Sequence, residues 1–278
     1  MTDDNEPRWD HYAAEYEAVH EPLTRQFAEA ALDAVPVAAG ERLLDIATGP
    51  GTLALLAARR GAAVTGVDIS PRMIARFNDR LFDAGFTGVS GRIMDGARLD
   101  FFADSSFDAV FCVFGIMLFA DFSGALAEMA RVTRPGGRAA LVVWNGLDRM
   151  EHVRVWLGAV AQAFPQFQPT PPPPTWVILQ EPASLARILG EAGFAAVDIR
   201  TARREWRIPS PAWFAAHADL SPAAESLYRS LGPGARERVR RILEEQLQAR
   251  FGDRPFSLAA EANIACGTKP HAMQREPV

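Results

Sequence analysis

Three aspartates and a glycine-rich loop are the residues of this sequence whose types and spacing are best suited to chemistry. Asp45, Asp68 and Asp95 lie in or at the end of three successive apolar runs. If these runs are parallel strands, the carboxylates gather at the edge where open α/β sheets bind ligands. Asp68 can then accept both hydroxyls of a ribose, and Asp95 can accept a hydrogen bond from an adenine amino group.

The loop follows the first of these runs in the segment LLDIATGPGTLAL, residues 43–55. Its Gly49, Gly51 and Ala54 match the G-x-G-x-x-G/A pattern of dinucleotide-binding proteins. Glycines allow a sharp turn and a close approach of ligand to backbone, and the amides that begin the next helix are free donors. Such a loop suits a pyrophosphate, or the carboxylate end of a ligand that resembles an amino acid.

The three acids help to choose between these ligands. A pyrophosphate is negatively charged and suits a crowded acidic edge poorly. A cationic ligand that carries adenosine suits it better, and S-adenosylmethionine has that character, with a sulfonium, an ammonium and a ribose.

The elements that position these residues alternate between strands and helices. Four runs are almost continuously apolar, which is typical of parallel strands covered by helices on both faces. Ser70 is suited to cap the helix that begins at Pro71, and Gly85 is suited to end it. The pattern predicts a doubly wound α/β fold with strands at 42–47, 63–69, 90–95, 107–114, 137–144, 196–208 and 256–268. Helices are expected at 8–34, 52–60, from 71 to the stop at 85, 123–133, 151–163 and 181–192, with a helical insertion at 210–252.

Breaks in this alternation suggest how the chain is organised. A stiff proline tract, PQFQPTPPPP, interrupts it after the helix at 151–163. The expected parts are a helical cap (1–39), a cofactor-binding α/β core (40–145), an insertion with the proline-rich segment (146–180), a continuation of the core (181–208), a helical lid insertion (209–254), and a final strand with the tail (255–278).

Composition excludes several classes of function. The 278 residues carry a net charge of -5, which disfavours a general nucleic-acid binder. The longest uncharged apolar run, residues 109–120, is too short to span a bilayer, and the acidic N-terminus does not resemble a signal peptide. Cys112 and Cys266 are expected to be free thiols in a reducing compartment. We therefore expect a cytoplasmic protein without membrane insertion or a nucleic-acid partner, and the sequence allows a homo-oligomer.

Four segments in order resemble the motifs of a known family. They are LLDIATGPG, VTGVDISPRMI, RIMDGARLDFFADSSFDAVFCVFGIMLF and RVTRPGGRAALVVW. They are similar to those of class I S-adenosylmethionine-dependent methyltransferases, above all the branch with the ubiquinone and menaquinone biosynthesis enzymes. The resemblance is close over 40–145, and covers 181–208 and 256–268 in outline. It implies a Rossmann-like sheet of seven strands, the last antiparallel.

The resemblance also implies a role for individual residues. S-adenosyl-L-methionine would be the cofactor and S-adenosyl-L-homocysteine the product. The segment WDHYAAEY, residues 9–16, resembles a helix that folds over the cofactor, where Tyr12 or Tyr16 would contact its carboxylate; an amphipathic helix packed on the sheet explains it equally well. The other implied roles are the methionine loop (Asp45, Thr48, Gly49, Gly51), the ribose (Asp68), the adenine (Ile69, Met73, Asp95, Gly96) and the sulfonium end (Phe114).

The acceptor is expected to be a small, apolar or aromatic metabolite, because the insertions are rich in aromatic residues. A phenolic acceptor would be helped by a base. His152 and His217 are the candidates, with His11 as a third, and each is also explained as a packing or surface histidine. No histidines have the spacing of metal ligands, so no metal is expected.

Two other functions remain open to the sequence. The match at Gly49, Gly51 and Ala54 allows an NAD(P)-dependent oxidoreductase, although Asp95 and the absence of a Tyr-x-x-x-Lys pair disfavour it. A non-catalytic protein that binds S-adenosylmethionine is also compatible with the motifs. A methyltransferase that acts on nucleic acid or protein is disfavoured by the net negative charge.

Overall fold

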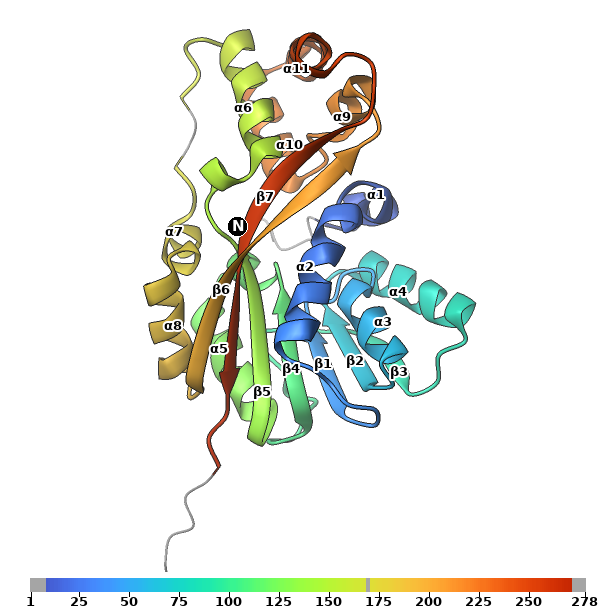
Figure 1. Cartoon of the computed structure of the whole chain (residues 1–278), viewed down its shortest axis with the longest axis vertical. Coiled ribbons are helices and arrows are strands. Elements are labelled where there is room, and N and C mark those ends of the chain that lie inside the picture. The colour runs from blue at the N-terminus through green and yellow to red at the C-terminus, as the bar shows by residue number, and fades with distance from the viewer. Residues whose placement is uncertain (1–8, 169–170, 272–278) are drawn as a thin grey trace, which may run out of the picture.

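A mixed sheet of seven strands forms the centre of the protein, in the order β3-β2-β1-β4-β5-β7-β6 (Figure 1). The computed structural model describes residues 9–168 and 171–271. The first five strands are parallel, and β7 runs antiparallel to both β5 and β6. The predicted Rossmann-like fold is confirmed. The strands are β1 (Arg42–Ile46), β2 (Ala63–Asp68), β3 (Val89–Ile93), β4 (Phe107–Val113), β5 (Thr133–Trp144), β6 (Ala195–Ile208) and β7 (Phe256–Thr268).

Helices cover both faces of the sheet, because neighbouring apolar residues of each strand point to opposite sides. Leu43 packs into the cluster on the side of α2, α3 and α4, whereas Leu44 packs into the cluster on the side of α5 and α8. The helices are α1 (Ala13–Val19), α2 (Glu21–Ala34), α3 (Thr52–Arg59), α4 (Pro71–Ala84), α5 (Phe122–Val132), α6 (Glu151–Ala163), α7 (Pro174–Gln180), α8 (Pro182–Glu191), α9 (Pro211–His217), α10 (Pro222–Leu231) and α11 (Ala235–Phe251).

The capping residues predicted the two ends of α4 correctly. The Ser70 hydroxyl accepts from the Met73 amide at 3.1 Å, and Gly85 ends α4 with φ = +66°. Several elements differ from the prediction. The helix expected at 8–34 is divided into α1 and α2, and β3 ends at Ile93, two residues before Asp95. β5 starts at Thr133 because that residue already pairs with Phe107 across an irregular register. α7 starts at Pro174, inside the expected stiff tract, because proline suits the first turn of a helix.

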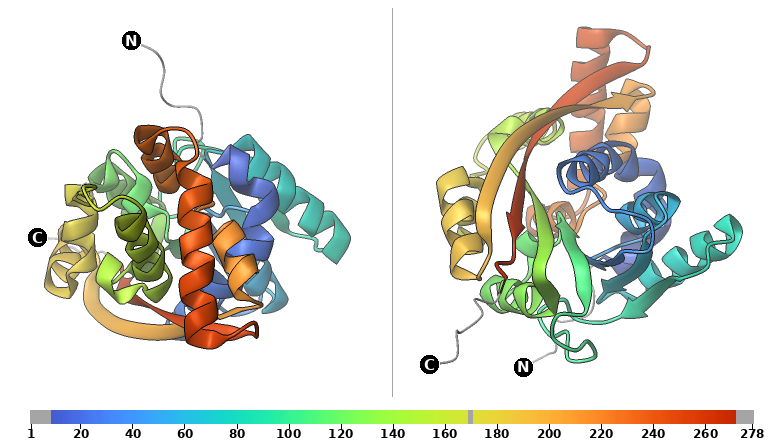
Figure 2. Two further views of the ribbon diagram at one scale, coloured as in Figure 1. Left: turned by 90° about the horizontal axis from the view of Figure 1, so that it is seen from above. Right: turned by 60° about the horizontal axis from the view of Figure 1, so that its bottom comes forward.

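The strands β6 and β7 run past the end of β5 and carry the helices of the second insertion (Figure 1). β5 pairs with β7 only from Ala262 to Thr268, while β6 and β7 stay paired to the Ile208–Phe256 rung. We call α6, α9, α10 and α11 the lid. In Figure 2, left, the long α11 crosses the front of the molecule, packed against α6 and α9.

The lid shares one apolar core with the α2 face of the sheet. Trp206, Phe214 and Leu243 of this region are buried in the same cluster as Phe27 of α2. The lid is therefore held to the sheet by packing as well as by its two strands. In the described part of the chain, no helix is long and apolar enough to cross a bilayer.

Candidate functional site

The glycine loop joins β1 to α3, and its two glycines have different surroundings. Gly51 has φ = +84°, and a Cβ added there would lie 2.0 Å from the Phe77 ring. Gly49 has φ = +56°, but a Cβ there would meet nothing within 4 Å. Gly51 is therefore required by packing and conformation. Gly49 leaves open space beside the backbone, which a ligand can use.

Two aspartates hold this loop from beneath. The Thr48 hydroxyl donates to Asp45 at 2.6 Å, and the Gly49 amide donates to Asp68 at 2.9 Å. Asp68 also accepts from the Ser70 amide at 2.9 Å, so its carboxylate ties the loop to the start of α4. The sequence-predicted loop residues are thus brought together around one turn.

Burial raises the pKa of both aspartates above the usual value. Asp45 is 1% exposed, and burial raises its pKa to about 7, against the hydrogen bond from Thr48. Burial also raises the pKa of Asp68, although the amides of Ser70 and Gly49 oppose that rise. A carboxylate that has lost its hydration gains most from a neighbouring cation. The loop therefore favours a positively charged ligand.

The residues expected near ribose and adenine lie beyond Asp68. Ile69 is 49% exposed directly after β2, while Met73 is buried beneath it in α4. Asp95 is exposed and accepts from the Ala97 amide at 2.9 Å. An exposed isoleucine directly after Asp68 offers an apolar surface that a flat ring can cover.

Gly96 is buried next to this edge. A Cβ there would lie 2.5 Å from Ile46 and 2.7 Å from the Phe119 ring. The glycine is thus required by close packing, a reason that the sequence-based prediction did not include.

The two candidate tyrosines point to different partners. Burial, together with the charges of Glu21, Asp68 and Asp45, raises the pKa of Tyr16 to about 12. Tyr16 is therefore the tyrosine that lies near the acids of the loop. The Tyr12 hydroxyl donates instead to Glu225 of the lid at 2.7 Å.

Arg80 clamps the N-terminal helices onto the loop. Its guanidinium donates to both oxygens of Glu21 at 3.0 and 2.9 Å, and to the Pro50 carbonyl at 3.0 Å. In the same region, Arg76 donates twice to Glu17 of α1, and the Ser70 hydroxyl donates to Asp10. The helix α1 is therefore fixed above the loop by charged contacts.

These residues fit the cofactor that the acids and the loop suggest. The Thr52 hydroxyl oxygen, at the start of α3, is buried without a hydrogen-bond partner. The space beside Gly49 and the exposed face of Ile69 lie along the same edge of the sheet. An orphaned donor, an open backbone and buried acids suit a ligand with a carboxylate, a cation and an adenosine.

An aromatic cluster begins where β4 and β5 end. Phe114, with φ = +58°, stacks on Trp144 with ring centroids 3.9 Å apart and planes 20° apart. Phe27 of α2 meets both rings edge-on at 5.6 Å. Phe114 directly follows β4, which pairs with β1, so it lies at the same sheet edge as the loop.

His152 continues this cluster toward the lid. Its ring lies 5.5 Å from Trp206 and 6.3 Å from Trp144, both edge-on. Its Nδ1 is buried without a hydrogen-bond partner. Burial, aided by the neighbouring His20, lowers the pKa of His152 to about 3. The side chain is therefore an uncharged imidazole at neutral pH.

The other two candidate bases have less suitable places. The His217 Nδ1 lies 2.6 Å from the Trp213 carbonyl of its own helix, and the two rings stack at 4.5 Å. This arrangement favours a packing role. His11 is exposed. Among the described residues, no three His, Cys, Asp or Glu side chains group as metal ligands do.

His20 is a site residue that the sequence did not single out. Its Nε2 lies 2.8 Å from the Leu220 carbonyl of the lid, and its ring lies 5.3 Å from Tyr16. Burial lowers its pKa. His20 thus stands between the tyrosine near the acids and His152. Its partners are distant in sequence, so no local pattern could have indicated this.

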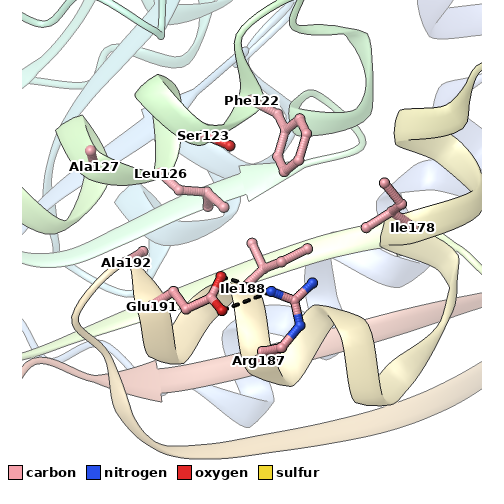
Figure 3. Close-up of a pocket in the computed structure, with 9 residues that line it drawn as sticks. All are labelled: Phe122, Ser123, Leu126, Ala127, Ile178, Arg187, Ile188, Glu191 and Ala192. Atoms are coloured by element: carbon pink, nitrogen blue, oxygen red, sulfur yellow. Dashed lines mark hydrogen bonds and ion pairs between the residues drawn. The ribbon is translucent and has the colours of Figure 1, made fainter.

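A groove of about 320 Å³ lies elsewhere, between α5, α7 and α8 (Figure 3). Phe122, Leu126, Ile178 and Ile188 make it apolar, and Arg187 pairs with Glu191 at its rim. None of the sequence-predicted site residues lines this groove. The candidate site is therefore the edge described above.

Comparisons with known proteins identify the family of the chain. Residues 44–141 match the model of a family described as "Methyltransferase domain". The chain is 31% identical to a demethylmenaquinone methyltransferase from Mycobacterium marinum, over 79% of this chain and 96% of that one. It is 41% identical to the enzyme of that name from Tropheryma whipplei, over 39% of this chain and only 44% of the relative.

A solved structure shows the same fold. It is that of Haemonchus contortus phosphoethanolamine N-methyltransferase 2, in complex with phosphomonomethylethanolamine and S-adenosylhomocysteine. The TM-score is 0.57 at 20% identity, and the match covers 94% of this chain and 58% of that one.

Proposed function

We propose that this chain, which belongs to the class I S-adenosylmethionine-dependent methyltransferases, moves a methyl group to a small apolar or aromatic metabolite. S-adenosylmethionine is the cofactor of this family, and this membership sets aside the NAD(P)-dependent alternative. The observation that carries the proposal is the pair of buried carboxylates, Asp45 and Asp68, around the open backbone of Gly49.

Bound S-adenosylmethionine supplies a methyl carbon on a positively charged sulfur, which departs as a neutral thioether. The acceptor atom forms the new bond and gives up its proton to a base or to solvent. Asp45, the Thr52 hydroxyl and the loop amides would hold the amino-acid end. Asp68 would hold the ribose, and Asp95 with Ile69 the adenine. Phe114 would face the reacting end.

The protein's contribution is mainly to orient the acceptor and to exclude water. Holding two reactants in line is worth about 7–11 kcal/mol in well-oriented cases. The lid and α1 are suited to this task, since Tyr12 and His20 join the two segments through Glu225 and the Leu220 carbonyl. The cap expected at 1–39 and the lid insertion expected at 209–254 would share this task.

A ring of the quinone type is the acceptor that the relatives suggest, because two of them are named demethylmenaquinone methyltransferases. The aromatic cluster around Phe114, Trp144 and Trp206 supports it. A histidine base is less well supported. A base works best when its pKa is near the working pH, and the pKa of His152 is about 3.

Cofactor selection tests the proposal. Calorimetry should detect binding of S-adenosylhomocysteine to the full chain and none of NADH at the same concentrations. Preferential binding of NADH would contradict the proposal. Turnover with S-adenosylmethionine then separates an enzyme from a protein that only binds it.

A further inference from the structure

We infer that His152 is a specificity residue that selects an uncharged aromatic acceptor bearing a hydroxyl group, by offering it the unpartnered Nδ1 of a neutral imidazole. The inference rests on the proposed function and concerns the acceptor half of the same site. The sequence suggests His152 as a base, whereas the structure assigns it a role in recognition.

The position of His152 is the first argument. Phe114 lies where the reacting end of the cofactor is expected, and it stacks on Trp144. His152 contacts that same Trp144 from α6, with Trp206 of β6 on its other side. Trp144 therefore links the imidazole to Phe114, and the surrounding aromatic rings suit a flat acceptor.

The hydrogen-bonding state of His152 is the second argument. Its Nδ1 is buried and has no partner, although buried polar atoms in folded proteins nearly always have one. The residue as a whole is half-buried, so His152 is not completely enclosed by the protein. A ligand that enters beside the ring can supply the missing partner. A hydroxyl suits either tautomer of imidazole, because it both donates and accepts.

Charge is the third argument, because it excludes anionic acceptors. Among the described residues, burial and His20 are what shift the pKa of His152, and neither a carboxylate nor a guanidinium contributes. The adjacent Glu151 is turned away and accepts from the Ala259 amide at 2.8 Å. His20 is itself held by the Leu220 carbonyl. A carboxylate or phosphate on the acceptor would find no cation here to replace its hydration.

Three small molecules of one shape test this inference by calorimetry, with and without S-adenosylhomocysteine. 1-Naphthol carries a hydroxyl, 1-methylnaphthalene replaces it with a methyl group, and 1-naphthoate replaces it with an anion. We expect 1-naphthol to bind at least tenfold more tightly than 1-methylnaphthalene, with 1-naphthoate weakest.

Variants then identify the group responsible. His152→Phe keeps a flat ring but removes both nitrogens, and should reduce the preference for 1-naphthol to about twofold or less. His152→Gln keeps a donor and an acceptor, and should retain part of it. Tyr228→Phe is the matched control. It removes the hydroxyl that accepts a hydrogen bond from the Trp156 indole within the lid, and it should leave the preference intact.

Several results would overturn the inference. They are an unchanged preference in His152→Phe, tighter binding of 1-naphthoate, and no binding of 1-naphthol to the wild-type protein. Failure of S-adenosylhomocysteine to bind would instead contradict the proposed function, because the naphthalene titrations are also made without it. Thermal unfolding of each variant shows whether a lost preference reflects a lost fold.

Discussion

The two halves of the candidate site differ in both charge and origin. The cofactor half is acidic, with Asp45, Asp68 and Asp95 within one sheet edge and a loop encoded by neighbouring residues. The acceptor half is aromatic and uncharged, and its residues come from α2, β5, α6 and β6. A cation and a neutral ring therefore have separate places. Tyr16 and His20 lie where the two halves meet.

This difference explains how each half tolerates change. The loop is formed by neighbouring residues and fixed by their backbone conformation. Single substitutions there should therefore distinguish residues needed for stability from residues needed for cofactor binding. The aromatic half is part of the lid core, so its substitutions need controls for stability.

The largest effect should come from the loop glycines. Gly51→Ala forces a Cβ against Phe77 and a left-handed backbone, which should lower the free energy of unfolding by about 3–5 kcal/mol. Gly49→Ala meets open space, so it should cost only the strain of about 1–2 kcal/mol and reduce cofactor affinity. Urea unfolding of both variants measures the difference. Equal losses of stability would show that the two glycines do not have separate roles.

Asp68→Ala should remove most of the binding of S-adenosylhomocysteine, by about 100-fold or roughly 2.7 kcal/mol. The variant would lose the proposed hydrogen bonds to the ribose, and the Gly49 amide would lose its acceptor. Asp100→Ala, an exposed acid beyond β3, is the control and should bind normally. Calorimetry compares the two. Normal binding by Asp68→Ala would place the cofactor elsewhere.

The pH dependence of binding should identify Asp45. Its pKa is about 7, and a bound cation favours the carboxylate, so affinity for S-adenosylhomocysteine should rise about tenfold from pH 6 to pH 8. Without ligand, the quantity that depends on Asp45 is the free energy of unfolding, and it changes with pH in the opposite direction. The folded state keeps a proton that the unfolded chain releases near pH 4. Stability should thus fall between pH 4 and pH 7. Asp45→Asn should flatten both profiles, and a persistent slope in that variant would implicate another group.

A smaller effect is expected where the start of α2 is held against the loop. Arg80→Met removes the contacts to Glu21 and the Pro50 carbonyl while keeping an unbranched apolar stem. Cofactor affinity should fall about threefold to tenfold, mainly through faster dissociation. Arg25→Met, which breaks only an exposed pair with Glu29, is the control. Stopped-flow dissociation measures both, and equal rates would show that the contact between Arg80, α2 and the loop does not retain the cofactor.

Local signals made much of the fold predictable. The helix at 151–163 and the strand at 256–268 have the predicted ends, and Ser70 and Gly85 bound α4 as expected. The loop residues could also be predicted from the sequence, because Thr48, Gly49 and Gly51 come directly after one strand. The structure gathers these residues around one turn, held by Asp45 and Asp68.

The residues of the acceptor half were harder to predict from the sequence, for a physical reason. His20 meets Leu220 across 200 positions of sequence, and Trp144 meets Phe27 only because α2 packs on the sheet. Such contacts depend on tertiary packing, which periodicity does not encode. His217 is a different case, because its contacts with Trp213 lie within one helix, and the aromatic residues around it suggested a site rather than local packing.

The most direct test of the central claim follows the methyl group itself. The protein is incubated with methyl-labelled S-adenosylmethionine and an extract of its own cells, which is then separated by size, charge and solubility. The account predicts label in an uncharged, organic-extractable small molecule, with Asp68→Ala transferring almost none. Label in an anionic metabolite, a protein or a nucleic acid would contradict the division of the site into an acidic cofactor half and a neutral acceptor half.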